Sequence, residues 1–442
     1  MIKIYVKQAW QMMKQQKLFS TIYIIGTALA VCFTLAVVYS VYIRVAGFYP
    51  DYDKANTYKM LPIQVTMADG KKSMVYRLSH QTVNDWFRSL KDVEGVTALY
   101  QTYESKFVKL PEGKGDYSIY SKFTDPDFFK VCSFTFVEGA PFTEEDFRSG
   151  IRNIVITDML AKRIFGTDRG LVGKELNISF EDYRICGVVK APSTASSFGF
   201  AHVYFPYTSE PGYNALDENM PISGSLTVYL VMKNKAQRDA VWEQLQARIR
   251  EFNQANQGIM QLELNQRPMS NSQTTLHYMY YQDEQYSKFN LWEVVRYYIY
   301  LMFLLLIVPA INLSGMISSR MEDRLPEMGV MKSFGASKSR LLGQVLWENL
   351  LLTFIGGLLG LLFLWGGLVI AKNWIFSLFY LWGIDIRPSA EIPFEVPSEV
   401  MFSPLLLIAV LLICVAVNVL SALIPAWYAL RKPIVYSINQ KD

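Results

Sequence analysis

The clearest pattern along the chain is the spacing of its charged residues. Four stretches contain no Asp, Glu, Lys or Arg, and they are Leu18 to Ile43, Tyr297 to Ser319, Asn349 to Ala371 and Val400 to Leu430. Each is longer than the about 20 helical residues that cross the roughly 30 Å hydrocarbon core of a bilayer. Soluble helices rarely run this far without a charge, so the pattern predicts four transmembrane helices.

The flanks of these stretches differ in the sign of their charge. Basic residues dominate three of them, which are residues 1–17, residues 320–340 and the tail that begins at Arg431. The segment 372–399 instead has two bases against four acids. By the positive-inside rule, both termini and residues 320–340 are predicted to be cytoplasmic. The first apolar run is too long for the 7–15 residues of a cleaved signal peptide, so we expect it to be retained as an anchor.

Between the first two apolar stretches lies a long segment in which strand-like and helix-like patterns alternate. Apolar β-branched runs occur at Ile154–Ile156, Tyr183–Val189 and Leu226–Val231, and helical periods at Leu160–Phe165 and Ala236–Phe252. This alternation favours an α+β domain of one or two lobes. Its two flanks are expected to pair with each other, because both must return to the same membrane surface.

The predicted fold class is therefore an α-helical membrane protein with four transmembrane helices and a large α+β extracytoplasmic domain inserted between helices 1 and 2. The predicted segments are a cytoplasmic interfacial amphipathic helix (1–17), transmembrane helix 1 (18–46), the extracytoplasmic domain (47–290), transmembrane helix 2 (291–319), a cytoplasmic coupling segment (320–340), transmembrane helix 3 (341–372), an extracytoplasmic loop (373–402), transmembrane helix 4 (403–430) and a cytoplasmic tail (431–442). For residues 1–17, an unstructured leader is the alternative to an interfacial helix.

Composition excludes several other classes. Only 19% of the 442 residues are charged, below the roughly 25% of soluble domains, while the mean hydropathy of +0.15 requires a large water-soluble part. A net charge of +4 is too small for a nucleic-acid footprint. Four cysteines in this length cannot form a disulfide scaffold. Cys132 and Cys186 fall in the same predicted domain, where we expect two buried thiols and keep a disulfide as the alternative.

Catalytic and metal-binding motifs are missing from the sequence. There is no G-x-x-x-x-G-K-[ST] phosphate loop, and no serine lies in a nucleophile elbow. His80, His202 and His277 lack a paired His or Cys at ligand spacing. The apolar stretches carry no ionisable group at their middle, which disfavours an ion-coupled carrier. We therefore expect no catalytic residue, no cofactor and no metal, and an energy source outside this chain.

The coupling segment, residues 320–340, contains good helix punctuation. Pro326 suits a first helical position, Gly335 suits the left-handed position after the last turn, and Ser337 or Ser339 could cap the next helix. A helix between these points predicts that Met328, Met331 and Phe334 project from one side. They would either enter a groove of a partner protein or dip into the lipid interface.

Three stretches resemble one known family. The first is Arg320, Glu327, Gly329-Val330, Lys332 and Gly335-Ala336, with Glu348 after it; the second is Asp127-Phe128-Phe129, Glu138-Gly139, Ala161 to Gly166, Val172 to Lys174 and Tyr183 to Val189; the third is Ile424 to Ala429 with Pro433. Together they resemble the MacB/FtsX-like permeases of ABC transporters, which include the LolC/LolE lipoprotein-release subunits. The ATPase domain fused to the N-terminus of MacB itself does not occur in this sequence.

The resemblance implies a bacterial inner-membrane subunit that works with a separate ABC ATPase. It also implies a homo- or heterodimer with a like permease, an inserted lobe at about residues 123–220, and a possible extracytoplasmic adaptor or cargo. The ATPase contact is expected at Glu327, Met328, Met331, Lys332, Phe334, Gly335 and Ala336. Export or extraction of a hydrophobic peptide, a drug or a lipoprotein is the expected function. An FtsX-like regulator of a cell-wall hydrolase is the alternative, and a membrane-anchored enzyme is a third, disfavoured one.

Overall fold

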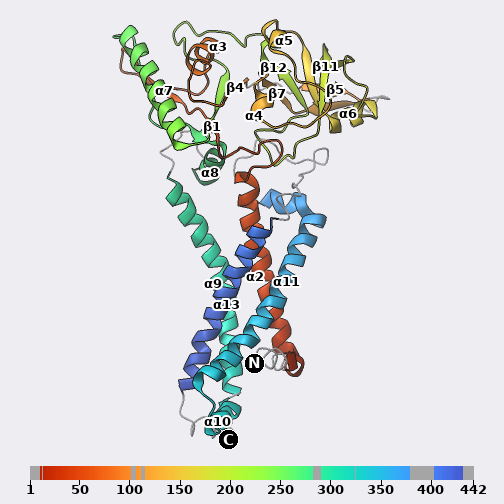
Figure 1. Cartoon of the computed structure of the whole chain (residues 1–442), viewed down its shortest axis with the longest axis vertical. Helices are drawn as coiled ribbons and strands as arrows, with labels where there is room; N and C mark the ends of the chain where they lie inside the picture. Colours follow the sequence, from red (N-terminus) through yellow and green to blue (C-terminus); the bar gives the residue numbers. More distant parts are fainter. Residues whose placement is uncertain are drawn as a thin grey trace. The chain divides into compact units, whose positions relative to one another are not determined.

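The computed structural model describes residues 10–11, 13–100, 106–110, 115–281, 290–323, 325–378 and 403–431 (Figure 1). The chain divides into two compact units. The helical unit comprises Met1–Tyr42, Trp292–Phe379 and Met401–Asp442, and the α+β unit comprises Ile43–Leu291 with Tyr380–Val400. The predicted interfacial helix and the loop at 373–402 fall largely on residues outside the described part, as does the tail after Arg431.

Long helices make up the helical unit. They are α2 (Lys17–Val45), α9 (Leu291–Asp323), α11 (Lys338–Leu378) and α13 (Pro404–Arg431), with the short α10 (Leu325–Ser333) between α9 and α11. Among the described residues, Lys17–Val45 and Ser339–Ile370 are long and apolar enough to cross a membrane. The four-span topology stays a prediction.

Small residues let two of these helices approach closely. A Cβ atom added at Gly356 of α11 would lie 2.8 Å from Cβ of Thr27 on α2, and one added at Gly360 would lie 2.6 Å from the carbonyl oxygen of Ala28. Real side chains do not tolerate such distances, so the Gly-x-x-x-Gly spacing is what allows the contact. The hydroxyl groups of Tyr23 and Thr353, 3.2 Å apart, add a hydrogen bond between the same helices.

Two sheets form the α+β unit. The larger has the strand order β15 (Met269–Ser270), β1 (Thr57–Lys59), β13 (Leu226–Val231), β4 (Gly95–Tyr100), β7 (Ser121–Thr124), β12 (Val203–Pro206), β9 (Asn153–Thr157), β11 (Glu181–Val189), β10 (Glu175–Ile178), β5 (Lys106–Lys109) and β6 (Asp116–Ile119), and β8 (Phe136–Gly139) pairs with β11. The smaller joins β14 (Met260–Glu263), β2 (Ile63–Met67) and β3 (Lys72–Val75). Among the described strands, the β7–β12 and β9–β11 pairs are parallel and the others are antiparallel.

Helices and short turns connect these strands. They are α3 (His80–Thr82), η1 (Val83–Phe87), α4 (Phe128–Val131), α5 (Glu144–Arg148), α6 (Asp158–Phe165), η3 (Tyr207–Ser209), α7 (Lys235–Ala255) and α8 (Asn271–Tyr281). Capping residues mark the ends of the two predicted helices, α6 and α7. Thr157 caps the start of α6 and Gly166 ends it in the left-handed region, while Asn234 and Gln237 form a capping box at α7.

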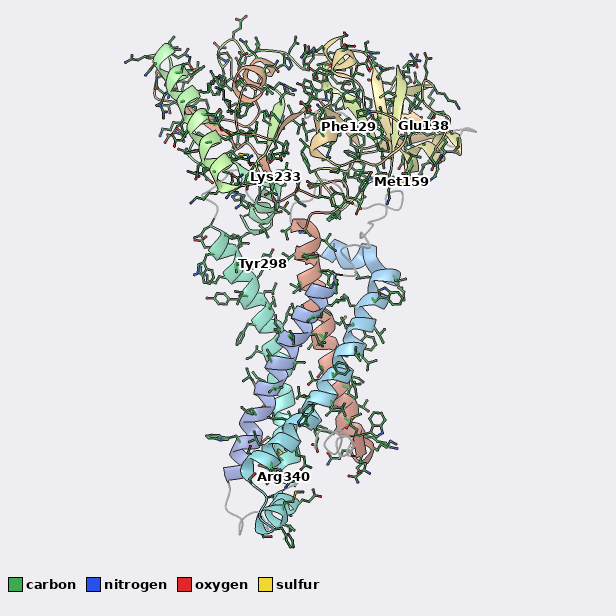
Figure 2. All side chains as sticks on the ribbon, viewed as in Figure 1. Phe129, Glu138, Met159, Lys233, Tyr298 and Arg340 are labelled. Carbon is green, nitrogen blue, oxygen red and sulfur yellow. The ribbon has the colours of Figure 1, made fainter. Side chains whose placement is uncertain are left out.

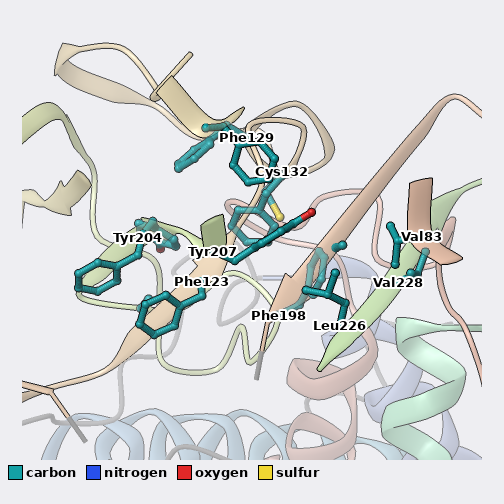
Figure 3. Packing of buried hydrophobic residues seen from close by; sticks show 14 of the residues in the cluster. Val83, Phe123, Phe129, Cys132, Phe198, Tyr204, Tyr207, Leu226 and Val228 are labelled. Atoms are coloured by element: carbon teal, nitrogen blue, oxygen red, sulfur yellow. The ribbon is translucent and has the colours of Figure 1, made fainter. Parts of the chain in front are cut away.

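The core of the α+β unit is rich in aromatic side chains. Phe123 stacks on Phe205 with ring centroids 4.8 Å apart, and Tyr204 packs edge-on against Phe129 and Phe134. Figure 3 shows several of these rings gathered with the buried thiol of Cys132. Cys132 and Cys186 are free thiols; Cys132 is buried as expected, whereas Cys186 is half-buried.

The structure confirms the elements predicted by periodicity. The three strand-like runs become β9, β11 and β13, and the two helical patterns become α6 and α7. The predicted pairing of the two flanks is also confirmed, because β1 pairs with β13 and β15, and β2 pairs with β14. In the larger sheet, strands from residues 57–100 and 226–270 meet those from residues 106–206 where β4 pairs with β7.

Candidate functional site: the coupling segment and the sheet junction

Helix α10 in the coupling segment has a well-defined C-terminal end. Gly335 follows it with a φ of +89°, and the backbone N–H of Ala336 donates to the carbonyl of Met331 at 2.9 Å. This 6→1 hydrogen bond around a left-handed glycine is a Schellman motif, so the predicted role of Gly335 is confirmed. Pro326 is the second residue of the helix, one position later than expected.

The start of α11 is equally well defined. The side-chain oxygen of Ser337 accepts from the backbone N–H of Arg340 at 3.3 Å, which makes Ser337 the N-cap. Only three residues therefore lie between the end of α10 and that cap. Short, capped connections of this kind give α10 a fixed direction relative to the start of α11. Figure 2 marks Arg340 at this point of the chain.

Exposure differs sharply among the predicted contact residues. The side chain of Phe334 is 87% exposed, and Val330 and Glu327 are exposed as well. Met331 is instead half-buried, and with Ala336 it packs against a cluster in the helical unit; the buried members of that cluster are Tyr23, Ile317, Met321, Leu341, Val345 and Leu352. The expectation that Met331 projects is therefore wrong, because its face of α10 is the one that closes onto α9 and α11. The side chains of Met328 and Lys332 lie outside the described part.

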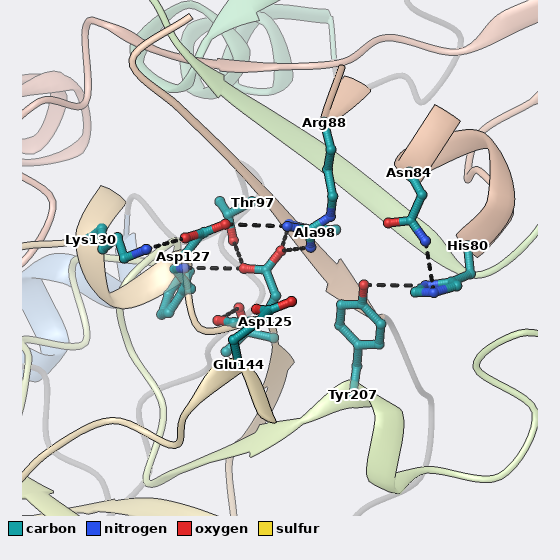
Figure 4. Close-up of polar contacts among 12 residues, drawn as sticks. His80, Asn84, Arg88, Thr97, Ala98, Asp125, Asp127, Lys130, Glu144 and Tyr207 are labelled. Carbon is teal, nitrogen blue, oxygen red and sulfur yellow. Dashed lines mark hydrogen bonds and ion pairs between the residues drawn. The ribbon is translucent and has the colours of Figure 1, made fainter. Parts of the chain in front are cut away.

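A buried carboxylate lies where the two groups of strands meet, and we call its surroundings the sheet junction: Arg88, Thr97, Ala98, Asp125 and Asp127. Asp125 follows β7 directly and is completely buried. The Arg88 guanidinium forms a salt bridge with Asp125 at 2.8 Å and another with Asp127 at 3.2 Å (Figure 4). On β4, Thr97 donates its hydroxyl to Asp125 at 2.6 Å and the Ala98 N–H donates at 2.9 Å.

The carboxylate of Asp125 also accepts from the backbone N–H of Phe128 at 3.1 Å, at the start of α4. Burial raises its pKa to about 6, even though Arg88 and the Thr97 and Ala98 donors stabilise the charged form. One side chain thus joins β4, β7, α4 and the segment after η1. This role of Asp125 was not predicted from the sequence, although an Asp-Pro pair three residues ahead of a short apolar helix is a recognisable capping signal.

Beside the sheet junction lies a cavity of about 540 Å³, whose polar lining includes Arg88, Asp127, Lys130, Glu144 and Arg148. Its cations are all paired within the unit, Lys130 with Asp127 at 2.7 Å and Arg148 with Glu144 at 2.8 Å. The cavity therefore presents salt bridges rather than a poised nucleophile or base.

The histidines occupy separate places in the α+β unit. His202 accepts from the Tyr120 N–H at 3.1 Å, and its burial lowers its pKa to about 4. His80 lies 2.9 Å from the Asn84 amide and 3.4 Å from the Tyr207 hydroxyl. His277 is buried on α8. Within the described ranges, no group of three or more His, Cys, Asp or Glu side chains could hold a metal ion.

Comparison with known proteins agrees with this architecture. Residues 20–248, more than half of the chain, match the model of the MacB-like periplasmic core domain, and residues 299–434 match the FtsX-like permease C-terminal model. A curated relative, the uncharacterized ABC transporter permease YknZ of Bacillus subtilis (strain 168), is 23% identical over 299 residues. That match covers 65% of this chain and 66% of the relative, slightly less than two thirds of its length.

Three solved structures show weaker likeness. The extracellular domain of YknZ from Gram-positive bacteria is 18% identical, with a TM-score of 0.31, over 46% of this chain and 100% of that one. The periplasmic region of MacB from Actinobacillus actinomycetemcomitans is 14% identical, with a TM-score of 0.32, over 48% of this chain and 89% of that one. A permease domain from Porphyromonas gingivalis is 16% identical, with a TM-score of 0.33, over 50% of this chain and 94% of that one. These scores are too low to carry an argument.

The family therefore follows from the sequence models and from the permease relative, and it agrees with the resemblance of the coupling segment. Proteins of this family are generally non-catalytic membrane subunits. The apolar helices Lys17–Val45 and Ser339–Ile370 likewise indicate a membrane protein. The chain belongs to the MacB/FtsX-like permeases of ABC transporters.

Proposed function

We propose that this chain is the permease subunit of an ATP-driven complex, and that it transmits movement of a separate cytoplasmic ATPase to the α+β unit. One observation carries the proposal. Phe334, 87% exposed, follows the last helical residue of a short helix that is capped between two long apolar ones. A large aromatic held in water by fixed backbone is what a partner's groove can desolvate.

The proposed ATPase contact keeps the predicted residues and adds the exposed Val330, and its members have different roles. Phe334, Val330 and Glu327 form the exposed surface. Gly335 and Ala336 fix its direction through the Schellman motif, and Met331 anchors it to the helical unit. Met328 and Lys332 remain part of the proposal from sequence alone.

Truncation of Phe334 tests the contact. Removing a buried aromatic anchor commonly costs about 2 kcal/mol, roughly thirtyfold in affinity. Phe334→Ala in the tagged full chain should therefore reduce the ATPase recovered with it, as counted by mass spectrometry, and abolish the ATP hydrolysis that co-purifies. Phe303→Ala is the matched control, because Phe303 on α9 is 62% exposed but lies outside the coupling segment. Full ATPase recovery with Phe334→Ala would refute the contact.

The proposed topology has four spans, both termini in the cytoplasm, and residues 47–290 outside the inner membrane. Its support is the charge asymmetry of the flanks. Lys71→Cys, at a side chain that is 85% exposed, and Arg340→Cys provide the test. In intact cells, a membrane-impermeant thiol reagent should label the first and not the second. Labelling of both would contradict the model.

The proposed cargo is a hydrophobic peptide, a drug or a lipoprotein, handled by a homo- or heterodimer with or without an adaptor. The alternative, an FtsX-like regulator of a cell-wall hydrolase, is less well supported, because the domain of about 240 residues is larger than such regulators use. Mass spectrometry of the purified complex separates the two. A bound amphiphile with the ATPase favours transport, whereas a bound hydrolase favours regulation.

A further inference from the structure

The residues after α2 form a partly buried loop of the α+β unit, Gly47–Lys54, which we call the anchor loop. Phe48 and Asp51 are each 2% exposed and Lys54 is 3% exposed. The loop turns tightly, since Phe48 and Asp51 form a β-bridge and a Cβ atom at Gly47 would lie 2.1 Å from the Tyr52 carbonyl oxygen. Loops are normally exposed, so the burial of Phe48, Asp51 and Lys54 in this one requires an explanation.

Two side chains of the α+β unit cap the C-terminal end of α2. The Lys54 ammonium donates to the carbonyl of Arg44, and the Ser272 hydroxyl of α8 donates to the carbonyl of Val45 at 2.7 Å. These carbonyls have no partner within the helix, and a cation there also complements the helix dipole. The last turn of α2 is therefore held by the anchor loop and by α8 together.

The anchor loop also contacts the segments that follow α4 and β11. The Pro50 carbonyl accepts from the Ser133 N–H at 2.9 Å, directly after α4. The Tyr49 hydroxyl donates to the Lys190 carbonyl at 2.8 Å and accepts from the Thr135 N–H at 3.2 Å. A displacement of the loop would thus act on the segments after α4 and β11 as well as on α8.

The charges around the loop are buried and only partly satisfied. Asp51 faces Lys54 and Asp53 of its own segment, Lys122 of β7, Cys132 at the end of α4 and Asn271 of α8. Within the described part of the chain, neither carboxylate oxygen of Asp51 has a well-formed hydrogen bond. Apolar side chains would anchor a static loop at lower cost, because buried charges rarely stabilise more than apolar substitutes of similar volume. Buried charges instead suit a joint whose geometry has to be specific.

We propose that the anchor loop is the joint through which α2 moves the α+β unit, with Lys54 as the positioning residue that locks the last turn of the helix to the loop. The inference rests on the proposed ATP-driven function. It predicts that a change at Lys54 disconnects the α+β unit from the ATPase without disturbing the ATPase contact at α10.

Lys54→Met in the full complex tests the joint, with the exposed Lys71→Met as control. The measurement is hydrogen exchange of the α+β unit, read by mass spectrometry with and without a non-hydrolysable ATP analogue. The variant should keep wild-type ATPase recovery and lose the nucleotide-dependent change in exchange over residues 130–136 and 190–200. The control should keep both. A full nucleotide response in Lys54→Met would overturn the joint.

A double variant separates positioning from simple stability. Lys54→Met alone removes the cation that most favours the charged form of the buried Asp51 carboxylate and destabilises the unit, whereas Asp51→Asn with Lys54→Met removes both buried charges of the loop. The double variant should fold and still lack the response, because the Arg44 carbonyl has lost its donor. If the response returns, the pair is only structural and the inference is wrong. If no ATPase is recovered with the wild-type chain, the proposed function itself is refuted.

Discussion

The α+β unit and the helical unit treat large aromatic side chains in opposite ways. In the α+β unit, Phe123, Phe128 and Tyr204 are all less than 2% exposed. In the helical unit, Phe33 and Phe303 are about 60% exposed. Water drives the first arrangement, because burial of apolar area is the main stabilising term there. The second is stable only where the surrounding solvent is itself apolar, so the two units fold against different solvents.

Polar groups show the same difference. The sheet junction buries a carboxylate with four donors around it, whereas the contact of α2 with α11 uses the Tyr23–Thr353 hydrogen bond and two glycines. The α+β unit is held by long-range burial and charge compensation. The helical unit is held by close backbone approach and by local helix geometry.

Two phenylalanine truncations test this comparison most strongly. Phe128→Ala should lower the free energy of unfolding of the α+β unit by about 3–5 kcal/mol, because it leaves a cavity among packed rings. Phe303→Ala should change it by less than about 0.5 kcal/mol. Denaturant unfolding of the full chain, followed by hydrogen exchange in each unit, gives both values. Equal losses of unfolding free energy in the two variants would mean that the two units do not fold against different solvents.

Removal of the cation at the sheet junction should have the next largest effect. Arg88→Met leaves the Asp125 carboxylate buried without its counter-charge, which costs about 3 kcal/mol. Arg148→Met breaks the exposed pair with Glu144 and should cost less than about 1 kcal/mol. Thermal unfolding of both variants measures the difference. A loss of stability below about 1 kcal/mol in Arg88→Met would show that the sheet junction does not stabilise the α+β unit.

The pH dependence of stability tests the buried anchor loop. Burial raises the pKa of Asp51 from 3.8 to about 6. Between about pH 4 and 6 the folded state therefore holds a proton that the unfolded state has lost, so stability falls as pH rises and is level above pH 6. The contribution is on the order of 2–3 kcal/mol. Asp51→Asn should reduce this slope but not abolish it, because Asp125 has a similarly raised pKa. An unchanged slope would show that Asp51 is hydrated.

Local geometry in the helical unit should give the smallest effect. Gly335→Val forces a branched residue into the left-handed region, at a cost of about 1–2 kcal/mol. No atom lies within 4 Å of the added Cβ, so the cost is conformational and should appear as weaker ATPase recovery. Gly343→Ala, equally unobstructed but within α11, should be neutral or slightly stabilising. If Gly335→Val recovers ATPase as the wild type does, the Schellman motif does not orient Phe334.

Prediction from sequence succeeded where the signal was local. The helical period of residues 236–252 and the strand run 226–231 became α7 and β13 because each pattern encodes which face is buried. Gly335 and Ser337 could be assigned because caps depend on neighbours within four residues. The burial of Met331 was missed, because it depends on α9 and α11, which are distant along the chain.

The sequence by itself determined the charge-free stretches, the strands and helices with strong periodicity, the caps of the coupling segment and the family resemblance, because these depend on composition and on short-range periodicity. Only the tertiary structure decided the strand order, the burial of Asp125 beside Arg88 and the packing of the anchor loop against α8 and the segment after α4. Asp51 and Asp125 look like ordinary surface acids in the sequence. Their roles arise because segments that can lie more than 200 residues apart in the sequence pack together and exclude water around them. No local sequence pattern indicates that burial.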